Sequence, residues 1–271
     1  MELGIRLISS TVNSIPKPHS IAIILIRSTK MGRYFITGSS DGLGSLAALR
    51  LIALGHAVVL HARNAQRATD AASACPGSVA VVIGDLTSLA ETKALASAAN
   101  AHGPYDGVVH NAGLYRAASG IFEVNTLAPY VLTCLMAKPK RLVYLSSGLH
   151  QTGQPRLDDI HRSGYGDTKL HDVMLAKAFA RRWAKEGVEA FSMDPGWVPT
   201  KMGGASATGS TEDAVDTIVM LALGEGAAKG KGGRYFFKSA ERKSSAIADD
   251  QALQDRLLDV LGAISGVTAP A

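Results

Sequence analysis

A glycine-rich stretch near residue 40 limits what this chain can fold into more than any other feature. An apolar run that ends at Thr37 leads directly into the sequence Gly38-Ser39-Ser40-Asp41-Gly42-Leu43-Gly44. Glycine adopts backbone dihedral angles that other residues avoid, and it lets another group come close to the backbone. A helix that begins at such a turn presents free N–H groups and its positive dipole end to an anion. The stretch therefore predicts a strand, a tight turn and a helix that together hold a dinucleotide pyrophosphate.

The same stretch admits a second interpretation. Residues Gly38 to Gly42 also fit the GxSxG nucleophile elbow of serine hydrolases, with Ser40 as the nucleophile. In that fold the elbow follows several strands, whereas here it follows the first convincing one, and the sequence has no HGGG-type oxyanion segment. A turn that binds no ligand is a third interpretation of the motif taken alone. We favour the dinucleotide site.

Composition agrees with an ordinary globular enzyme. The chain has 271 residues, 46% of them apolar, which suffices for one large α/β domain or two small ones. No apolar run approaches the ~18 residues of a membrane-spanning helix. Cys75 and Cys134 stand far apart without CxxC spacing, and the sequence has no metal-binding or P-loop motif. We therefore expect a cytoplasmic protein with no dedicated metal site and no membrane partner.

Charge is unevenly distributed along the chain. The formal charge is +5, and residues 1–30 contribute +3 of it through four basic residues against Glu2. The other basic residues are scattered, so we expect no nucleic-acid partner. We interpret residues 1–30 as an N-terminal extension that is poorly ordered or reflects a non-native start, and Met31 as the natural start of a domain over residues 31–271. A transit peptide is the alternative, because the segment is rich in serine and poor in acids.

From Arg33 onward, β-rich apolar runs alternate with helical segments. The predicted strands are Arg33–Thr37, Ala57–His61, Val79–Ile83, Gly107–His110, Arg141–Leu145, Glu189–Met193 and Gly233–Phe237. The predicted helices run from the glycine turn to Leu54 and over Ala65–Ala74, Leu89–Ala101, Ile121–Met136, Tyr165–Glu186, Thr211–Leu223 and Ala252–Ile264. We find no internal repeat and no linker after residue 31. The pattern predicts an α/β fold, a single doubly wound Rossmann-type domain with about seven parallel strands and helices on both faces.

Seven short motifs make the chain resemble the short-chain dehydrogenase/reductase family over roughly residues 32–238. They are Thr37–Gly44, Gly84-Asp85-Leu86, His110-Asn111-Ala112-Gly113, Asn125, Ser146-Ser147, Tyr165-Gly166-Asp167-Thr168-Lys169 and Asp194-Pro195-Gly196-Trp197-Val198-Pro199-Thr200. Each motif alone is weakly specific, but all of them in the family's order, each at the expected strand end or helix, are highly specific. The resemblance implies an oxidoreductase that transfers hydride between a nicotinamide dinucleotide and a carbonyl/alcohol pair.

Tyr165 and Lys169 are four residues apart on a predicted helix, so their side chains share one face. A free phenol titrates near pH ~10, and a nearby ammonium favours the phenolate and brings proton exchange closer to neutral pH. The resemblance implies that Tyr165 is the general acid/base and that Lys169 also binds the nicotinamide ribose. An ordinary exposed pair on a helix is the alternative for these two residues alone.

Two further polar residues complete the catalytic set that the resemblance implies. Ser147 follows the strand Arg141–Leu145 at its carboxyl end, where α/β sheets bind ligands, and its hydroxyl suits a carbonyl oxygen. Asn125 lies within a predicted apolar helix, where asparagine is unfavourable. In the family this asparagine positions a water that relays protons to the lysine. A turn residue at Ser147 and a solvent-facing amide at Asn125 are the alternatives.

The remaining motifs are expected to hold the dinucleotide. The expected contacts are Gly38, Ser39, Ser40, Gly42, Leu43, Gly44, Arg63, Asp85, Leu86, Asn111, Ala112, Gly113, Tyr165, Lys169, Pro195, Gly196, Val198 and Thr200. The resemblance implies that Asp85 meets the adenine amino group. It also implies that Val198 and Thr200 meet the carboxamide and the phosphates.

The choice between NAD(H) and NADP(H) depends on the end of the second predicted strand. An acidic residue about 20 positions after the glycine turn selects NAD, whereas an arginine accommodates the NADP phosphate. The chain has no Asp or Glu between Gly44 and Asp70, and Arg63 offers a fork of donors suited to a phosphate. We therefore predict NADP(H) rather than NAD(H), with hydroxyl bonds added by Ser39 and Ser40. A solvated arginine is the alternative for Arg63.

The sequence thus predicts an NADP(H)-dependent oxidoreductase of the carbonyl reductase kind that acts on a small molecule. The resemblance adds the expectation of a homodimer or homotetramer. The alternatives are a non-catalytic dinucleotide sensor on the same fold and an epimerase or dehydratase of the extended branch. The intact catalytic set argues against a sensor, and the TGxxxGxG spacing argues against the extended branch. The connections from Gly113 to Asn125 and from Met136 to Arg141 are short for the family, which leaves the size of the substrate pocket open.

Overall fold

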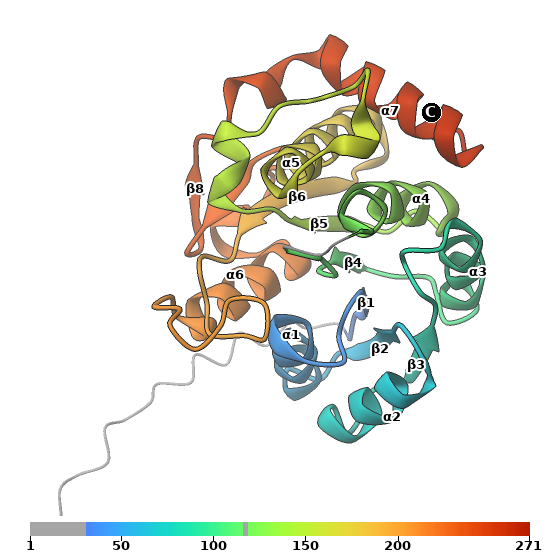
Figure 1. The fold of residues 1–271 in the computed structure, drawn as a ribbon. Helices are drawn as coiled ribbons and strands as arrows, with labels where there is room; N and C mark the ends of the chain where they lie inside the picture. The colour runs from blue at the N-terminus through green and yellow to red at the C-terminus, as the bar shows by residue number, and fades with distance from the viewer. Residues whose placement is uncertain (1–30, 116–118) are drawn as a thin grey trace, which may run out of the picture.

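The structure, a computed structural model, describes residues 31–115 and 119–271. The expected extension over residues 1–30 therefore lies outside the described residues. The described chain forms one twisted sheet with helices on both faces (Figure 1). This arrangement confirms the prediction of a doubly wound α/β domain.

The sheet contains eight described strands in the order β3-β2-β1-β4-β5-β6-β7-β8. Their bounds are β1 Arg33–Ile36, β2 Ala57–Ala62, β3 Ala80–Ile83, β4 Gly107–His110, β5 Arg141–Leu145, β6 Glu189–Asp194, β7 Tyr235–Phe237 and β8 Ala240–Arg242. All pairs from β3 to β7 are parallel. The strand order reverses between β1 and β4. Open α/β sheets bind ligands at the carboxyl ends of the strands beside such a reversal.

The antiparallel strand β8 was not predicted. It pairs with β7 through a tight turn in which Lys238 and Ser239 have positive φ angles of 49° and 56°. Hairpin turns with two positive φ angles favour Asn and Gly, and neither is present here. The turn therefore carries no recognisable sequence signature, and the expected parallel strands are otherwise confirmed.

Seven α-helices lie in the described residues. Their bounds are α1 Gly42–Ala53, α2 Ala65–Ala74, α3 Leu89–Asn100, α4 Ala128–Leu135, α5 Tyr165–Arg182, α6 Thr211–Leu223 and α7 Gln251–Ser265. The helix predicted over Tyr165–Glu186 ends earlier, at Arg182, and a short 3-10 turn leads to Gly187 in a left-handed conformation. The helix predicted over Ile121–Met136 contains a π-helical turn at Glu123–Leu127 before α4 begins.

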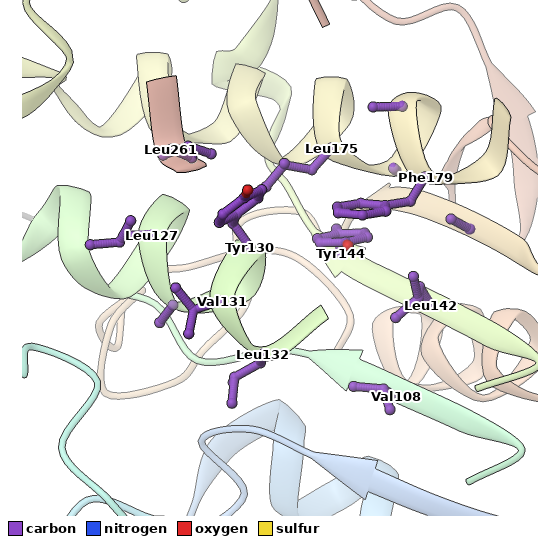
Figure 2. Packing of buried hydrophobic residues seen from close by; sticks show 14 of the residues in the cluster. Val108, Leu127, Tyr130, Val131, Leu132, Leu142, Tyr144, Leu175, Phe179 and Leu261 are labelled. Carbon is purple, nitrogen blue, oxygen red and sulfur yellow. The ribbon is translucent and has the colours of Figure 1, made fainter. Parts of the chain in front are cut away.

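Two hydrophobic clusters lie on opposite faces of the sheet. On one face α3, α4, α5 and α7 surround Tyr130, Tyr144 and Phe179, whose rings lie close together in Figure 2. On the other face α1 and α6 pack on Ile36 and Phe191. Burial from both sides explains why the parallel strands read as continuous apolar runs. None of the helices described here has the length and apolar character to cross a membrane.

Candidate active site

The glycine turn between β1 and α1 packs against the end of β4. Gly38 and Gly42 have positive φ angles of 61° and 57°, so a side chain at either position would strain the backbone. A Cβ at Gly38 would lie 2.9 Å from the Cα of Ala112, and a Cβ at Gly44 would lie 2.5 Å from Nδ2 of Asn111. The turn therefore requires glycine at these positions.

Hydrogen bonds from neighbouring strand ends hold this turn in place. The Asn111 side-chain amide donates to the carbonyls of Thr37 and Gly38 at 2.8 and 3.0 Å. The Gly38 N–H donates to Nδ1 of His61 at 2.9 Å, so the other ring nitrogen carries the proton and donates to the Gly84 carbonyl at 2.9 Å. Burial lowers the pKa of His61 and favours the neutral ring that this arrangement needs. His61 could not be identified from the sequence, because a histidine in a strand gives no signal of what its ring contacts.

The two serines of the turn have different environments. Ser39 is completely buried, and its hydroxyl donates to the Ile36 carbonyl and accepts from the His61 N–H, both at 2.9 Å. Its hydroxyl therefore stabilises the turn, whereas we expected both serines to add bonds to a cofactor phosphate. Ser40 is half-buried, and a bond from its hydroxyl to a cofactor phosphate stays a prediction. The Leu43 side chain packs in the core, and the expected contact of this residue with the cofactor also stays a prediction.

The N-terminus of α1 is suited to an anion. The residue before the helix, Asp41, makes no side-chain cap. Its carboxylate instead accepts from Arg67 at 2.5 Å and from Lys201 at 2.8 Å. The first helical N–H groups are thus not occupied by a capping side chain, which suits a phosphate. A Cβ at Gly42 would lie 3.8 Å from Cγ2 of Thr200, so the loop after β6 reaches the same helix end.

Arg63 and Asp85 lie just after β2 and β3. Arg63 is exposed, which makes its guanidinium accessible to a phosphate. The Asp85 carboxylate accepts from the backbone N–H and the hydroxyl of Thr87 at 2.9 and 2.8 Å. These bonds and the charge of Arg63 lower the pKa of Asp85. Leu86 is buried in the core.

Tyr165 and Lys169 lie at the start of α5, as predicted. Tyr165 is half-buried, and the Tyr115 ring packs edge-on against it with centroids 4.8 Å apart. Nζ of Lys169 lies 5.6 Å from the centre of the Tyr165 ring. The same ammonium donates to the Leu145 carbonyl at 2.7 Å and to Oδ2 of Asp172 at 2.8 Å. Sequence analysis missed Asp172, because an acid three residues after a lysine is common on exposed helices.

Burial opposes the charge on both members of the Lys169–Asp172 pair. Burial works to lower the pKa of Lys169, but the nearby Asp172 carboxylate and Tyr165 raise it, and the net direction is upward. Burial raises the pKa of Asp172 to about 6, although the ammonium works to lower it. The interaction within the pair thus favours the charged form of each group and opposes the effect of burial.

The paired serines after β5 play different parts. Ser146 is buried and its hydroxyl donates to the Lys169 carbonyl at 2.7 Å. Ser147 is half-buried and accepts from the Leu149 N–H at 3.3 Å, which leaves its own proton for a ligand. A Cβ at Gly166 would lie 3.2 Å from the Leu149 carbonyl, so this loop packs against the first turn of α5. The fold thus brings Ser147 to the start of α5.

Asn125 lies in the π-helical turn and is only 1% exposed, so it is not a solvent-facing amide. Its side chain accepts from the Leu114 N–H at 2.7 Å and donates to the Leu114 carbonyl at 3.0 Å and to the Thr168 hydroxyl at 3.1 Å. A Cβ at Gly113 would lie 3.5 Å from Oδ1 of Asn125 and 3.8 Å from Nζ of Lys169. Asn125 therefore joins the loop after β4 to α5, at the same corner as Lys169. Single π-helical turns are often found at functional sites.

The loop after β6 carries the last group of expected contacts. Gly196, with φ 77°, follows Pro195 and donates its N–H to the Asp194 carboxylate at 2.7 Å. Val198 is buried in the cluster that contains α1 and α6. Trp197 is exposed and donates its indole N–H to the Gly203 carbonyl at 2.8 Å. This loop thus spans from β6 to the N-terminus of α1.

Known proteins resemble this chain over most of its length. Residues 33–210 match the family model described as short chain dehydrogenase. An uncharacterized oxidoreductase of Emericella nidulans is 50% identical over 254 residues, which cover 89% of this chain and 99% of the relative. The short-chain dehydrogenase chyC of Penicillium rubens is 38% identical over 261 residues, which cover 89% of this chain and 100% of the relative.

Solved structures share the fold. An uncharacterized protein from Mycobacterium paratuberculosis matches with a TM-score of 0.73 at 21% identity, over 89% of this chain and 95% of that one. An NADPH-bound carbonyl reductase from chicken fatty liver matches with a TM-score of 0.65 at 21% identity, over 79% of this chain and 99% of that one. Together with the family model and the fungal relatives, the fold and the order of the motifs establish that the chain belongs to the short-chain dehydrogenase/reductase family of oxidoreductases.

Proposed function

We propose that this protein is an NADP(H)-dependent oxidoreductase that interconverts a small-molecule carbonyl and the corresponding alcohol. The catalytic set would be Tyr165, Lys169, Ser147 and Asn125. One observation carries the proposal: the Ser147 loop, the buried Lys169 ammonium and the buried Asn125 amide meet around the first turn of α5, which begins at Tyr165. They do so at the carboxyl ends of β4 and β5, beside the reversal in strand order.

The residues around the glycine turn fit a dinucleotide. The uncapped N-terminus of α1 suits the pyrophosphate, and Ala112 and Gly113 leave room for the cofactor beside it. The exposed Arg63 suits the phosphate that distinguishes NADP(H). The NADPH-bound carbonyl reductase with the same fold is consistent with this choice. When bound, the nicotinamide supplies or accepts the hydride.

Each catalytic side chain then has a separate task. In reduction, the Ser147 hydroxyl donates to the substrate carbonyl oxygen and stabilises the negative charge that develops on it. The Tyr165 phenol gives its proton to the same oxygen. The Lys169 ammonium stabilises the charge left on the Tyr165 oxygen, and Asn125 keeps the loop after β4 joined to α5. Alcohol oxidation uses the same groups in reverse.

Consumption of NADPH over a panel of aldehydes, ketones and quinones tests this proposal. We expect turnover with at least one class, and Tyr165→Phe should remove nearly all of it while cofactor affinity stays close to wild type, since only a hydroxyl is lost. Tyr105→Phe is a matched control, because it removes a phenolic hydroxyl that bonds the Ala99 carbonyl away from the site. Substantial residual reduction by Tyr165→Phe would show that another group donates the proton.

The same assay separates the alternatives. Tight NADPH binding without turnover on any substrate would favour a non-catalytic dinucleotide sensor. Ester cleavage that is lost in Ser40→Ala would indicate a serine hydrolase. A change of stereochemistry or loss of water without net cofactor consumption would indicate an epimerase or dehydratase.

We also propose that the protein is a cytoplasmic homodimer or homotetramer. Cys75 and Cys134 are both free thiols, which agrees with a reducing compartment. The oligomer is inferred from the family resemblance. Light scattering after size-exclusion chromatography measures the mass directly, and a monomeric mass would refute this part of the proposal.

A further inference from the structure

The ammonium of Lys169 has only part of its bonding capacity free. An ammonium has three N–H donors. One donates to the Leu145 carbonyl at 2.7 Å and another to Oδ2 of Asp172 at 2.8 Å. A single N–H therefore remains, and a Cβ at Gly113 would lie 3.8 Å from Nζ. The two bonds hold Nζ at the corner where the loops after β4 and β5 meet α5.

Asp172 is an unusual partner, because it places a carboxylate inside the protein. The side chains of Lys169 and Asp172 are only 6% and 3% exposed. Burial raises the pKa of Tyr144 on β5, and the nearby Cys134 and Asp172 add smaller effects in the same direction. A carboxylate buried this deeply is costly unless it is paired and hydrogen-bonded. Packing alone would be served as well by an apolar side chain, so the carboxylate points to a role through Lys169.

Without Asp172, two properties of Lys169 would be lost. Burial works to lower the pKa of the amine, and Asp172 exerts the largest effect in the opposite direction. A lysine side chain is also a flexible stem that needs fixed partners to aim one N–H in one direction. The Leu145 carbonyl supplies one partner from the strand, and Asp172 supplies the other from the helix.

We propose that Asp172 is a positioning residue for Lys169. Together with the Leu145 carbonyl it fixes the ammonium, keeps it charged in its buried position and leaves one N–H for the ribose of the dinucleotide. This inference rests on the proposed function of Lys169. It adds to the catalytic set a residue that itself contacts neither substrate nor cofactor.

The test is the affinity for NADPH, and in parallel for NADH, measured by fluorescence titration from about pH 7.5 to about pH 10, a range in which Asp172 stays ionised. Wild-type affinity should stay nearly level, because the carboxylate keeps Lys169 protonated. Asp172→Asn retains the shape and an acceptor oxygen but removes the negative charge. Its affinity should therefore fall at a lower pH than that of wild type, by about tenfold or more at the upper end. Asp172→Ala also loses the anchor, so it should bind more weakly at every pH.

Asp249→Asn is the matched control, because Asp249 pairs with a lysine of α5 from outside that helix, in the 3-10 turn Ala246–Asp249. Asp249 pairs with Lys177 at 2.7 Å but is 64% exposed, so its loss should leave the affinity and its pH dependence as in wild type. Asp172 variants that melt at lower temperature yet bind NADPH with the wild-type pH dependence would overturn the inference, since the role would then be structural only. If Asp172→Ala does not accumulate, the isosteric Asp172→Asn carries the test.

The failure of this inference is distinguishable from failure of the proposed function. Wild-type protein that binds neither dinucleotide would refute the proposed function and this inference with it. Turnover that survives in Tyr165→Phe would refute the catalytic roles alone. An unchanged pH dependence in Asp172→Asn, with wild-type binding intact, would refute the positioning role alone.

Discussion

Both ends of the proposed cofactor site contain ion pairs, but the pairs differ in burial. At the reacting end, Lys169 and Asp172 lie 2.8 Å apart with side chains 6% and 3% exposed. At the phosphate end, beside the N-terminus of α1, Asp41 pairs with Arg67 at 2.5 Å and with Lys201 at 2.8 Å, and the side chains of Asp41, Arg67 and Lys201 are 42%, 23% and 79% exposed. At both ends a carboxylate pairs with a cation, so a difference in the strength of the pairs comes from their exposure to solvent.

Solvent decides whether such a pair can be exchanged. An exposed pair contributes about 0–1 kcal/mol to stability and is screened by salt. Lys201 can therefore leave Asp41 for a phosphate at little cost, whereas Arg67 is only 23% exposed and also pairs with Asp70. Removing one partner of a buried pair leaves an uncompensated charge in the core, which costs about 3–5 kcal/mol. The pair at the reacting end is thus fixed, and the Asp41–Lys201 pair at the phosphate end is adaptable.

Breaking the buried pair should have the largest effect. Lys169→Ala should abolish turnover and NADPH binding, and should lower the free energy of unfolding by about 3–5 kcal/mol, because Asp172 is left without its partner. Lys201→Ala, which breaks an exposed pair, should lower it by less than about 1 kcal/mol. Urea unfolding measures both variants. Equal losses of unfolding free energy in the two variants would show that burial does not distinguish the two pairs.

Cofactor choice should depend on the exposed end. Arg63→Asp places a carboxylate where we expect the NADP phosphate, so the preference for NADPH over NADH should fall by roughly tenfold to a hundredfold, as expected for about 1.5–3 kcal/mol from hydrogen bonds to a charged group. The measurement is the ratio of kcat/KM for the two cofactors. Arg162→Asp, at an arginine whose side chain is 81% exposed, is the control. Equal efficiency of the wild type with both cofactors would contradict the assignment.

Acidic pH should lower the stability of the protein through a buried histidine near the site. His110 is buried against Tyr144 and bonds the Thr133 hydroxyl at 2.9 Å, and burial lowers its pKa to about 3. The unfolded chain takes up this proton near pH ~6.5, so the stability that the neutral ring provides is present above that pH and is lost as the pH falls.

At pH ~5 the loss amounts to about 2 kcal/mol, from 1.36 kcal/mol per pH unit. His110→Gln, which has no such proton to gain, should therefore lose about 2 kcal/mol less than wild type between pH ~7 and ~5 in urea unfolding. An identical pH dependence of the two proteins would show that His110 is not held neutral by burial.

The smallest expected effect is at Asp41. Asp41→Asn removes a negative charge beside the proposed phosphate site and releases Arg67 and Lys201. NADPH should bind a few-fold more tightly at low salt, and the gain should shrink as salt shortens the screening length to about 3 Å at 1 M. Stability should change by less than about 1 kcal/mol. Weaker NADPH binding in this variant would mean that the carboxylate itself holds part of the cofactor.

Much of the fold can be predicted because most strands and helix ends depend on residues that are close together in the sequence. The strands β1 to β7 are rich in apolar residues, since most of their positions are buried by helices on both faces of the sheet. Gly55 and Gly187 end helical segments in the left-handed conformation, as glycine at such positions predicts. The strand β8 depends instead on the free edge of β7 and on a turn of two ordinary residues. Neither is visible in a local pattern.

The residues of the candidate site also fall into those that a local sequence pattern predicts and those that it does not. Tyr165, Lys169 and Ser147 are marked by their order in the sequence and by their place at strand ends and on a helix. Asp172 has the same spacing from Lys169 as an exposed partner would have, and only the packing of α5 on β5 shows that it is buried. Ser39 was expected to face a phosphate because the sequence does not tell which hydroxyl of a turn points inward.

The π-helical turn at Glu123–Leu127 restricts where this chain can change in length. Such a turn amounts to an α-helix with one residue inserted. The turn itself takes up the extra residue, so deleting one residue there would restore a regular helix and leave the later positions on their present faces. A deletion after the turn would instead rotate Tyr130, which is completely buried, by about 100° around the helix axis and out of the core. Single-residue changes of length should therefore be tolerated in this turn and not at the start of α4, which guides chimeras and alignments across the segment.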